Sequence, residues 1–291
     1  MAERVGENEL EDADFDDTDF DDSDFDDSDF DDTDLEDDGA DEAATPGTVF
    51  TYDASLAPTD PAILDLLRHG DIAILGRMPW SSNGTFLVDV TRGGDHAPAI
   101  YKPHRGERPL WDFPSGLWKR EVASYELSRS MGFDLVPPTV IRTAGPLDEG
   151  SLQAFVPANF DEHYFTINDR PEFGDALRRL CAFDLVANSA DRKGGHCLVD
   201  GDDRLWAIDN GLTFHAEFKV RTVIWEFAGE TLPADVVEAL VRLLDCGLSP
   251  EVAELLDVFE RDAVLTRARA LLSNGRFMHD TTGRRYPWPM V

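Results

Sequence analysis

The stretch DLVANSADRKGGHCLVDGDDRLWAIDNGLTF, residues 184–214, decides the fold, because one aspartate precedes a predicted hairpin and another follows it. Asp191 opens the run Asp-Arg-Lys-Gly-Gly-His, and Asp209 directly follows a short apolar strand predicted for 205–208. Phosphoryl transfer from ATP requires one carboxylate that orients and deprotonates the acceptor and another that holds a divalent metal against the phosphates. Either acidic turn alone would fit an ordinary β-hairpin, but the two in this order favour a phosphotransferase.

The loop that begins at Asp191 has the spacing of a kinase catalytic loop. Protein kinases place a lysine two residues after the aspartate and a metal-binding asparagine five residues after it. Here Lys193 and His196 occupy those positions, and the two glycines between them allow the loop to fold tightly around phosphates. Asp191 and Lys193 are therefore the candidate catalytic residues, and His196 and Asp209 are the candidate ligands of Mg²⁺ or Mn²⁺.

A lysine and a glutamate upstream are expected to form an ion pair at the ATP site. Lys102 ends an apolar strand, and Glu121 lies on the apolar face of a helix predicted for 117–131. A buried carboxylate needs a partner, since isolated burial of a charge is costly. In a kinase, a lysine at the end of such a strand contacts the α- and β-phosphates of ATP. The alternatives are that Lys102 extends to solvent and that Glu121 pairs at the surface with Arg120 or Arg129.

A predicted hairpin near the start of the sheet could cover the phosphates. Two β-branched stretches, 71–77 and 85–91, predict antiparallel strands joined by the turn Met-Pro-Trp-Ser-Ser-Asn-Gly. Three residues of this turn are candidate ATP-binding residues: Ser82, Asn83 and Gly84. An ordinary hairpin is the alternative for the turn alone, but the strand that ends at Lys102 follows in the place where a kinase would have it.

The sequence resembles the phosphatidylinositol 3- and 4-kinase clan, and most of all the type II phosphatidylinositol 4-kinases and their bacterial relatives. Four blocks in the order of that clan carry the resemblance: 100–103 with Glu107 and Pro109, 121–125, 151–156, and 208–214 after Asp191. The resemblance implies an α+β fold of the two-lobed, atypical protein-kinase-like type, with a small β-rich N-lobe and a mainly helical C-lobe. It also implies a hinge strand against which adenine stacks, with three candidate ATP-binding residues: Gln153, Phe155 and Val156.

The sequence departs from the clan at His196, where the metal-binding residue is usually asparagine. An imidazole nitrogen suits metals softer than Mg²⁺, so Mn²⁺ is expected to support activity at least as well. Because the unperturbed pKa of histidine is roughly 6.5, activity is expected to fall below about pH 6. The alternative is that His196 only hydrogen-bonds within the loop.

Composition divides the chain into an acidic tail and one two-lobed domain. Residues 1–45 hold 23 acidic residues and one arginine, so they contribute −22 of the total charge of −33. From Asp14 they repeat a five-residue unit such as DFDDT, which matches neither helical nor strand periodicity. We expect a disordered tail, either a solubility segment or a docking arm for a basic protein partner. The N-lobe is expected over 46–156 and the C-lobe over 157–291, with helices near 173–187, 233–246 and 250–273.

Several classes of protein are disfavoured. No apolar run reaches the roughly 18 residues of a membrane helix and the N-terminus lacks a signal pattern, so a cytoplasmic protein without stable membrane insertion is expected. The three cysteines lack zinc-ligand spacing, and no nucleic-acid partner is expected. Because an acidic protein is repelled by anionic membranes, a protein or small-molecule hydroxyl is favoured as acceptor over an inositol lipid. The alternatives are a nucleotide-binding pseudokinase that acts through its tail, and transfer of AMP.

Overall fold

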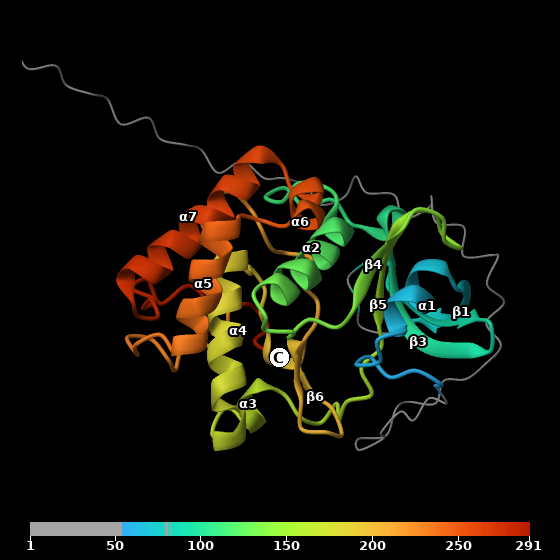
Figure 1. Ribbon diagram of the computed structural model, residues 1–291, viewed down its shortest axis with the longest axis horizontal. Helices are drawn as coiled ribbons and strands as arrows, with labels where there is room; N and C mark the ends of the chain where they lie inside the picture. Colours follow the sequence, from blue (N-terminus) through green and yellow to red (C-terminus); the bar gives the residue numbers. More distant parts are fainter. Residues whose placement is uncertain (1–53, 79–80, 82) are drawn as a thin grey trace, which may run out of the picture. The chain divides into compact units, whose positions relative to one another are not determined.

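The computed structural model describes residues 54–78, 81 and 83–291, so the acidic repeat tail (1–45) and Ser82 lie outside the described residues. Within these ranges the chain forms a five-stranded antiparallel sheet followed by a mainly helical half (Figure 1). The predicted α+β architecture with a β-rich and a helical lobe is confirmed. None of the helices in the described part is long and apolar enough to cross a membrane.

The β-rich lobe is a single sheet in the order β1-β2-β3-β5-β4. Its strands are β1 (Asp71–Arg77), β2 (Phe86–Arg92), β3 (Asp95–Pro103), β4 (Thr139–Arg142) and β5 (Gly150–Ala154). Residues alternate between the two faces, so that Val88, Val90 and Tyr101 are buried on one face and Lys102 lies on the other. The ladder thus fixes the side of the sheet on which Lys102 stands.

A short helix that the sequence did not predict covers the buried face of the sheet. Helix α1 (Ile63–His69) has seven residues, and it buries Ile63, Leu66 and Leu67 against the sheet core. Two turns are too few for helical periodicity to stand out from a short apolar run. Packing on the sheet, rather than intrinsic propensity, accounts for this helix.

Helix α2 (Leu117–Ser130) links the sheet to the helical lobe. It contacts β4 and β5 on one side and α6 (Pro250–Leu255) on the other, as Figure 1 shows. Ala123 and Leu127 belong to the core of the helical lobe, and almost the whole helix is buried. The predicted helix is therefore present, and it places Glu121 between the two lobes.

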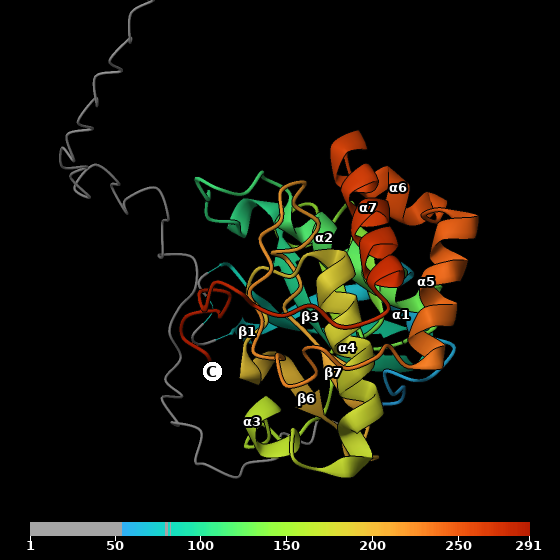
Figure 2. The ribbon, with the colours of Figure 1, turned by 90° about the vertical axis from the view of Figure 1, so that its left-hand side faces the viewer.

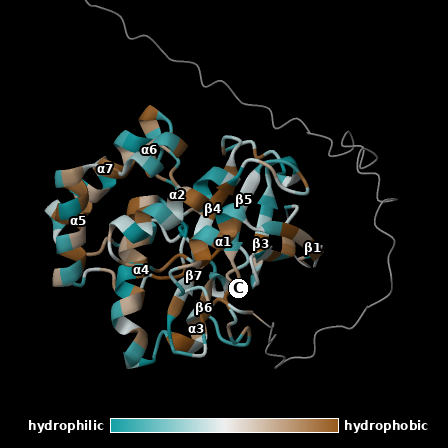
Figure 3. Ribbon diagram, turned by 45° about the vertical axis from the view of Figure 1, so that its right-hand side comes forward, coloured by the Kyte–Doolittle hydropathy of each residue, from teal (hydrophilic) through white to brown (hydrophobic). Residues whose placement is uncertain are grey.

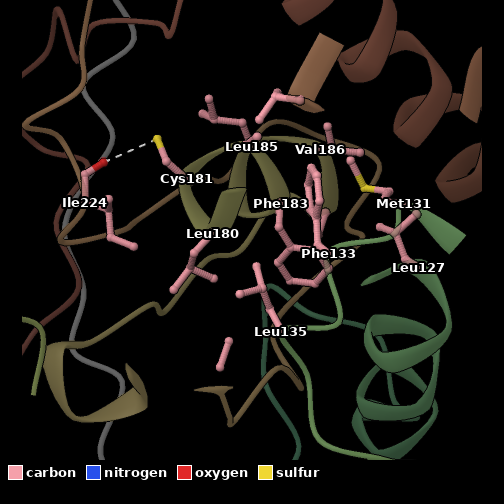
Figure 4. Packing of buried hydrophobic residues seen from close by; sticks show 14 of the residues in the cluster. Leu127, Met131, Phe133, Leu135, Leu180, Cys181, Phe183, Leu185, Val186 and Ile224 are labelled. Carbon is pink, nitrogen blue, oxygen red and sulfur yellow. Dashed lines mark hydrogen bonds between the residues drawn. The ribbon is translucent and has the colours of Figure 1, made fainter. Parts of the chain in front are cut away.

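The helical lobe packs around α4 (Gly174–Ala187), with Leu180, Phe183 and Val186 inside the core (Figure 4). The other helices are α3 (Tyr164–Ile167), α5 (Ala234–Cys246) and α7 (Val258–Asn274), with 3-10 turns η3 (His104–Gly106), η4 (Pro171–Phe173) and η5 (Gly194–His196). Helix α5 carries both hydrophilic and hydrophobic residues, as expected where one face is buried (Figure 3).

The single helix predicted for 250–273 is wrong, because the chain forms α6 and α7 instead. Leu256 is extended, and Asp257 caps α7 by accepting hydrogen bonds from the backbone N–H groups of Phe259 and Glu260 at 2.7 and 2.9 Å. Glu260 in turn accepts the N–H of Asp257, which completes a capping box. The sequence Asp-x-x-Glu was the signal for this break.

A two-stranded hairpin carries both aspartates of the deciding stretch. Strand β6 (Cys197–Val199) follows η5, and it pairs antiparallel with β7 (Leu205–Ala207). The N–H of Ile208 donates to the carbonyl of His196 at 3.0 Å, so the pairing continues to the end of the hairpin. Asp209 therefore lies beside the loop that Asp191 opens.

Candidate active site

Lys102 lies between two carboxylates, one on helix α2 and one at the end of the β6–β7 hairpin. Its Nζ contacts Oε1 of Glu121 and lies 2.8 Å from Oδ1 of Asp209. Burial alone would lower the pKa of Lys102, but Asp209 and Glu121 together raise that pKa above its usual value. The ammonium group therefore stays charged, and the predicted pair of Lys102 with Glu121 is present.

The alternative partners of Glu121 are engaged elsewhere. Arg120 forms a buried ion pair with Glu260 of α7. Arg129 pairs with Glu126, 2.6 Å away and three residues earlier on the same helix. The surface pairing of Glu121 with either arginine is thus not found.

Glu121 also fixes the turn that carries Asp209. Its Oε2 accepts the backbone N–H of Asn210 at 3.0 Å, and the hydroxyl of Thr213 donates to the carbonyl of Asn210 at 2.7 Å. Asp209 itself has a φ of 55°, a left-handed conformation that aspartate tolerates better than most residues. The nearby ammonium of Lys102 holds the pKa of Asp209 well below its usual range. A permanently ionised carboxylate results, which suits a ligand of a hard cation.

Asp191 and Lys193 pair within the catalytic loop, with Lys193 Nζ 3.2 Å from Asp191 Oδ2. Burial raises the pKa of Asp191, and Lys193 opposes this shift only in part. A raised pKa makes a carboxylate a better proton acceptor. The two predicted catalytic residues are therefore together, and Asp209 acts electrostatically on the same carboxylate.

His196 faces Asp209, with Nε2 of the ring 3.4 Å from Oδ2 of the carboxylate. Its Nδ1 accepts the backbone N–H of Lys193 at 3.4 Å. Ligation of a metal through Nε2 would place the proton on Nδ1, so this hydrogen bond would be given up. Within the described residues, no three His, Cys, Asp or Glu side chains form a metal-binding group.

The expected loss of activity near pH 6 through His196 needs correction. Burial lowers the pKa of His196 to about 4, because the charged imidazolium would lose its hydration, and Asp209 offsets only part of this effect. The ring is therefore neutral well below pH 6. Sequence alone gave the unperturbed value, since the burial of the side chain depends on the folded hairpin.

This burial predicts a pH-dependent stability. The folded state favours neutral His196, so its contribution is fully present above the unfolded pKa of roughly 6.5 and is lost as the pH falls toward 4. Measured by urea unfolding, the free energy of unfolding of the wild type should fall between pH 7 and pH 4 by about 3 kcal/mol more than that of His196→Gln. Equal losses in wild type and His196→Gln would contradict the burial.

Arg192 joins the two aspartate segments through a buried network. Its guanidinium lies 3.1 Å from the carboxylate of Asp184, donates to the carbonyl of Ile208 at 2.8 Å, and donates to Oδ1 of Asn210 at 2.5 Å. Thr222 donates a further hydrogen bond to Asp184 at 3.1 Å. Both ends of the Arg192 to Asp184 pair are fully buried. Asp184 is thus tied to the catalytic loop through Arg192, a link that the sequence did not predict.

The hinge residues lie where β5 ends and the connection to the helical lobe begins. The side-chain amide of Gln153 donates to the hydroxyl of Thr139 at 2.8 Å, and the N–H of Phe155 donates to the carbonyl of Pro98 at 3.1 Å. Val156 packs with Trp206 of β7 in a small cluster that spans both lobes. Val156 therefore reaches the hairpin that carries Asp209.

The end of the turn proposed to cover the phosphates is hydrogen-bonded to the segment after β3. Oδ1 of Asn83 accepts the N–H of Arg108 at 3.0 Å, and the N–H of Gly84 donates to the carbonyl of Gly106 at 2.8 Å. Phosphate contacts from these groups would have to replace those hydrogen bonds. The role of the turn in binding ATP stays a prediction, and Ser82 lies outside the described residues.

Comparison with known proteins places this geometry in context. No family model matches the chain. Among solved structures it is similar to the Golgi casein kinase (16% identity, covering 75% of this chain and 78% of the other, TM-score 0.42). It is also similar to hydra Fam20 with sugar, with 12% identity, coverage of 72% of this chain and 86% of the other, and a TM-score of 0.45. The Helicobacter pylori proinflammatory kinase CtkA is similar as well, with 12% identity, coverage of 72% of this chain and 94% of the other, and a TM-score of 0.39.

A curated protein shows a closer likeness in sequence. Protein Rv2133c of Mycobacterium tuberculosis is 34% identical over 261 residues, which cover 77% of this chain and 94% of that protein. The match thus takes in nearly the whole relative. The chain therefore belongs to the family of protein Rv2133c.

Proposed function

We propose that the chain is an ATP-dependent phosphotransferase with its active site between the two lobes. The observation that carries the proposal is the position of Lys102 on the sheet, held between Glu121 of the linking helix α2 and Asp209 of the helical lobe. In kinases, such a lysine and glutamate position the nucleotide phosphates, and an aspartate at the end of a strand binds the metal. The resemblance to the phosphatidylinositol 3- and 4-kinase clan supports the same assignment.

The side chains around Lys102 and Asp191 can each serve one part of the phosphate transfer. Lys102 would bind the α- and β-phosphates, with Glu121 keeping its ammonium in place. Asp191 would accept the proton of the acceptor hydroxyl while the hydroxyl oxygen bonds to the γ-phosphorus and the bond to the β-phosphate oxygen breaks, which releases ADP. Lys193 would orient the Asp191 carboxylate.

A divalent metal fits the donor set at Asp209. The ionised carboxylate is a hard oxygen ligand, and His196 would favour Mn²⁺ beside Mg²⁺. When bound, such a metal neutralises charge on the phosphates. For the acceptor, we favour a protein or small-molecule hydroxyl over an inositol lipid, because the chain is strongly acidic.

A nucleotide-binding pseudokinase is the second candidate. The observation that favours it is that Asp191 and Asp209 are each already paired with a lysine, and that His196 replaces the usual metal-binding asparagine. Such a protein would bind ATP without transferring any part of it. Its acidic tail would then carry the regulatory interaction.

One experiment separates these functions. The purified protein is incubated with cell extract, ATP and either Mg²⁺ or Mn²⁺, and modified acceptors are identified by mass. A kinase adds about 80 daltons per site and an AMP transferase adds a nucleotide, whereas a pseudokinase adds neither.

Asp191→Asn serves as the matched variant. We expect it to lose transfer while calorimetry still detects ATP binding, because the base acts on the acceptor rather than on the nucleotide. Near wild-type turnover in this variant would exclude Asp191 as the base.

A further inference from the structure

The segment after α7 returns to the catalytic loop. Figure 2 shows the end of the chain running from α7 back across the molecule, and one backbone hydrogen bond joins it to the turn that follows Asp191. The carbonyl of Met290 accepts the N–H of Gly194 at 2.7 Å. The carbonyl of Arg285 accepts two donors, the N–H of Thr222 and Nε1–H of Trp225, both at 3.1 Å. We call residues 284–291 the strap.

The strap is hydrogen-bonded to the segment that pairs with the catalytic loop. Arg192 and Thr222 form a parallel bridge, in which the N–H of Arg192 donates to Arg221 at 3.0 Å and its carbonyl accepts from Val223 at 3.1 Å. The remaining N–H of Thr222 points away from Arg192 and meets the strap at Arg285. One backbone hydrogen bond of an extended segment thus reaches the residue that pairs with Arg192.

The strap is held by backbone carbonyls and by the side chain of Arg285, which lies over the ring of Phe218 (4.7 Å to its centroid) and 3.7 Å from Asp280. Trp288 is 87% exposed, and Tyr286 and Met290 are also exposed, whereas Pro287 is buried. At the other end of the contact, a Cβ on Gly194 would lie 3.1 Å from the ring of Phe165 and 3.3 Å from the Met290 carbonyl. Glycine therefore allows the close approach, and any extended peptide could supply the carbonyl.

We propose that the acceptor of this site is a serine or threonine in an extended polypeptide, and that the strap occupies the acceptor's docking surface in the resting chain. This inference rests on the proposed function. The Gly194 N–H lies in the loop between Asp191 and His196, so a chain bound to it would carry a neighbouring hydroxyl to the candidate base. A small-molecule hydroxyl would need no such backbone contact, since it has no backbone to pair.

Removal of the strap tests the proposal. We compare the full chain, a chain that ends at Gly283, and Trp288→Phe, in which the exposed ring changes while every backbone contact stays. The probe is a mixture of peptides, each with one central serine or threonine, with labelled ATP. The truncated chain should phosphorylate the peptides about tenfold faster, because a tethered segment competes at an effective concentration near millimolar. Trp288→Phe should match the full chain.

A second measurement keeps the test decisive if turnover is slow. A fluorescent peptide of residues 284–291 should bind the truncated chain and inhibit it competitively against the peptide mixture, but not against ATP. No saturable binding up to millimolar peptide, or an unchanged phosphorylation rate, would overturn the proposal. Label transferred to free inositol or glycerol but not to peptides would overturn the substrate class.

Two controls separate this inference from the proposed function. Thermal unfolding shows whether the truncated chain is folded, and calorimetry shows whether it still binds ATP. If neither the full chain nor the truncated chain binds ATP, the proposed function itself fails. If both bind ATP and transfer phosphate equally fast to peptides, the function stands and the strap is not a competitor.

Discussion

Replacement of Asp209 by asparagine is expected to reduce phosphotransfer by about 10²–10³-fold. The substitution keeps the shape of the side chain but removes the charge that would hold the metal and that now pairs with Lys102 at 2.8 Å. Because Glu121 remains, Lys102 keeps one partner, so the fold should tolerate the change. The measurements are turnover with labelled ATP and calorimetric affinity for ATP in the presence of metal, and the affinity should also fall.

The same hairpin offers a matched control for this prediction. Asp202→Asn makes the same change of charge in the exposed turn between β6 and β7. It should leave both turnover and affinity within about twofold of the wild type. If Asp209→Asn behaves like Asp202→Asn, the assignment of the metal and nucleotide site to this end of the hairpin is wrong.

Much of the site follows from local patterns in the sequence. The pairing of Lys102 with Glu121 was foreseen because a carboxylate on an apolar helical face needs a partner, and a strand ending in lysine was available. Asp191 and Asp209 were foreseen because one short hairpin brings the two segments together. In each of these cases a few neighbouring residues carry the information.

Other features depend on residues that are distant in sequence. The role of Arg192 requires Asp184, Ile208 and Asn210 to converge on one guanidinium, which no local pattern shows. The lowered pKa of His196 depends on burial that only the folded hairpin creates. The strap likewise depends on a contact between Gly194 and Met290, almost 100 positions apart, so no local pattern near Gly194 predicts it.

The second large effect is expected on stability, from Arg192→Met. The substitution removes one member of a fully buried ion pair and leaves Asp184 without its guanidinium partner. Breaking such a pair costs about 3–5 kcal/mol, because an uncompensated charge stays in the core. Burial already raises the pKa of Asp184, and Arg192 opposes that shift, so the variant should favour a protonated Asp184. Urea unfolding at pH 7 measures the loss, which should be smaller at pH 5.

A nearby arginine and a double variant make this prediction specific. Arg221→Met removes the same kind of side chain from an exposed position beside the loop, and it should change the free energy of unfolding by less than about 0.5 kcal/mol. Removing both charges with Arg192→Met and Asp184→Leu should restore part of the stability, since no unpaired charge remains buried. Phosphotransfer should stay low in the double variant, because Arg192 also holds Ile208 and Asn210 on either side of Asp209. If Arg192→Met and Arg221→Met are equally stable, Arg192 does not hold the two aspartate segments together.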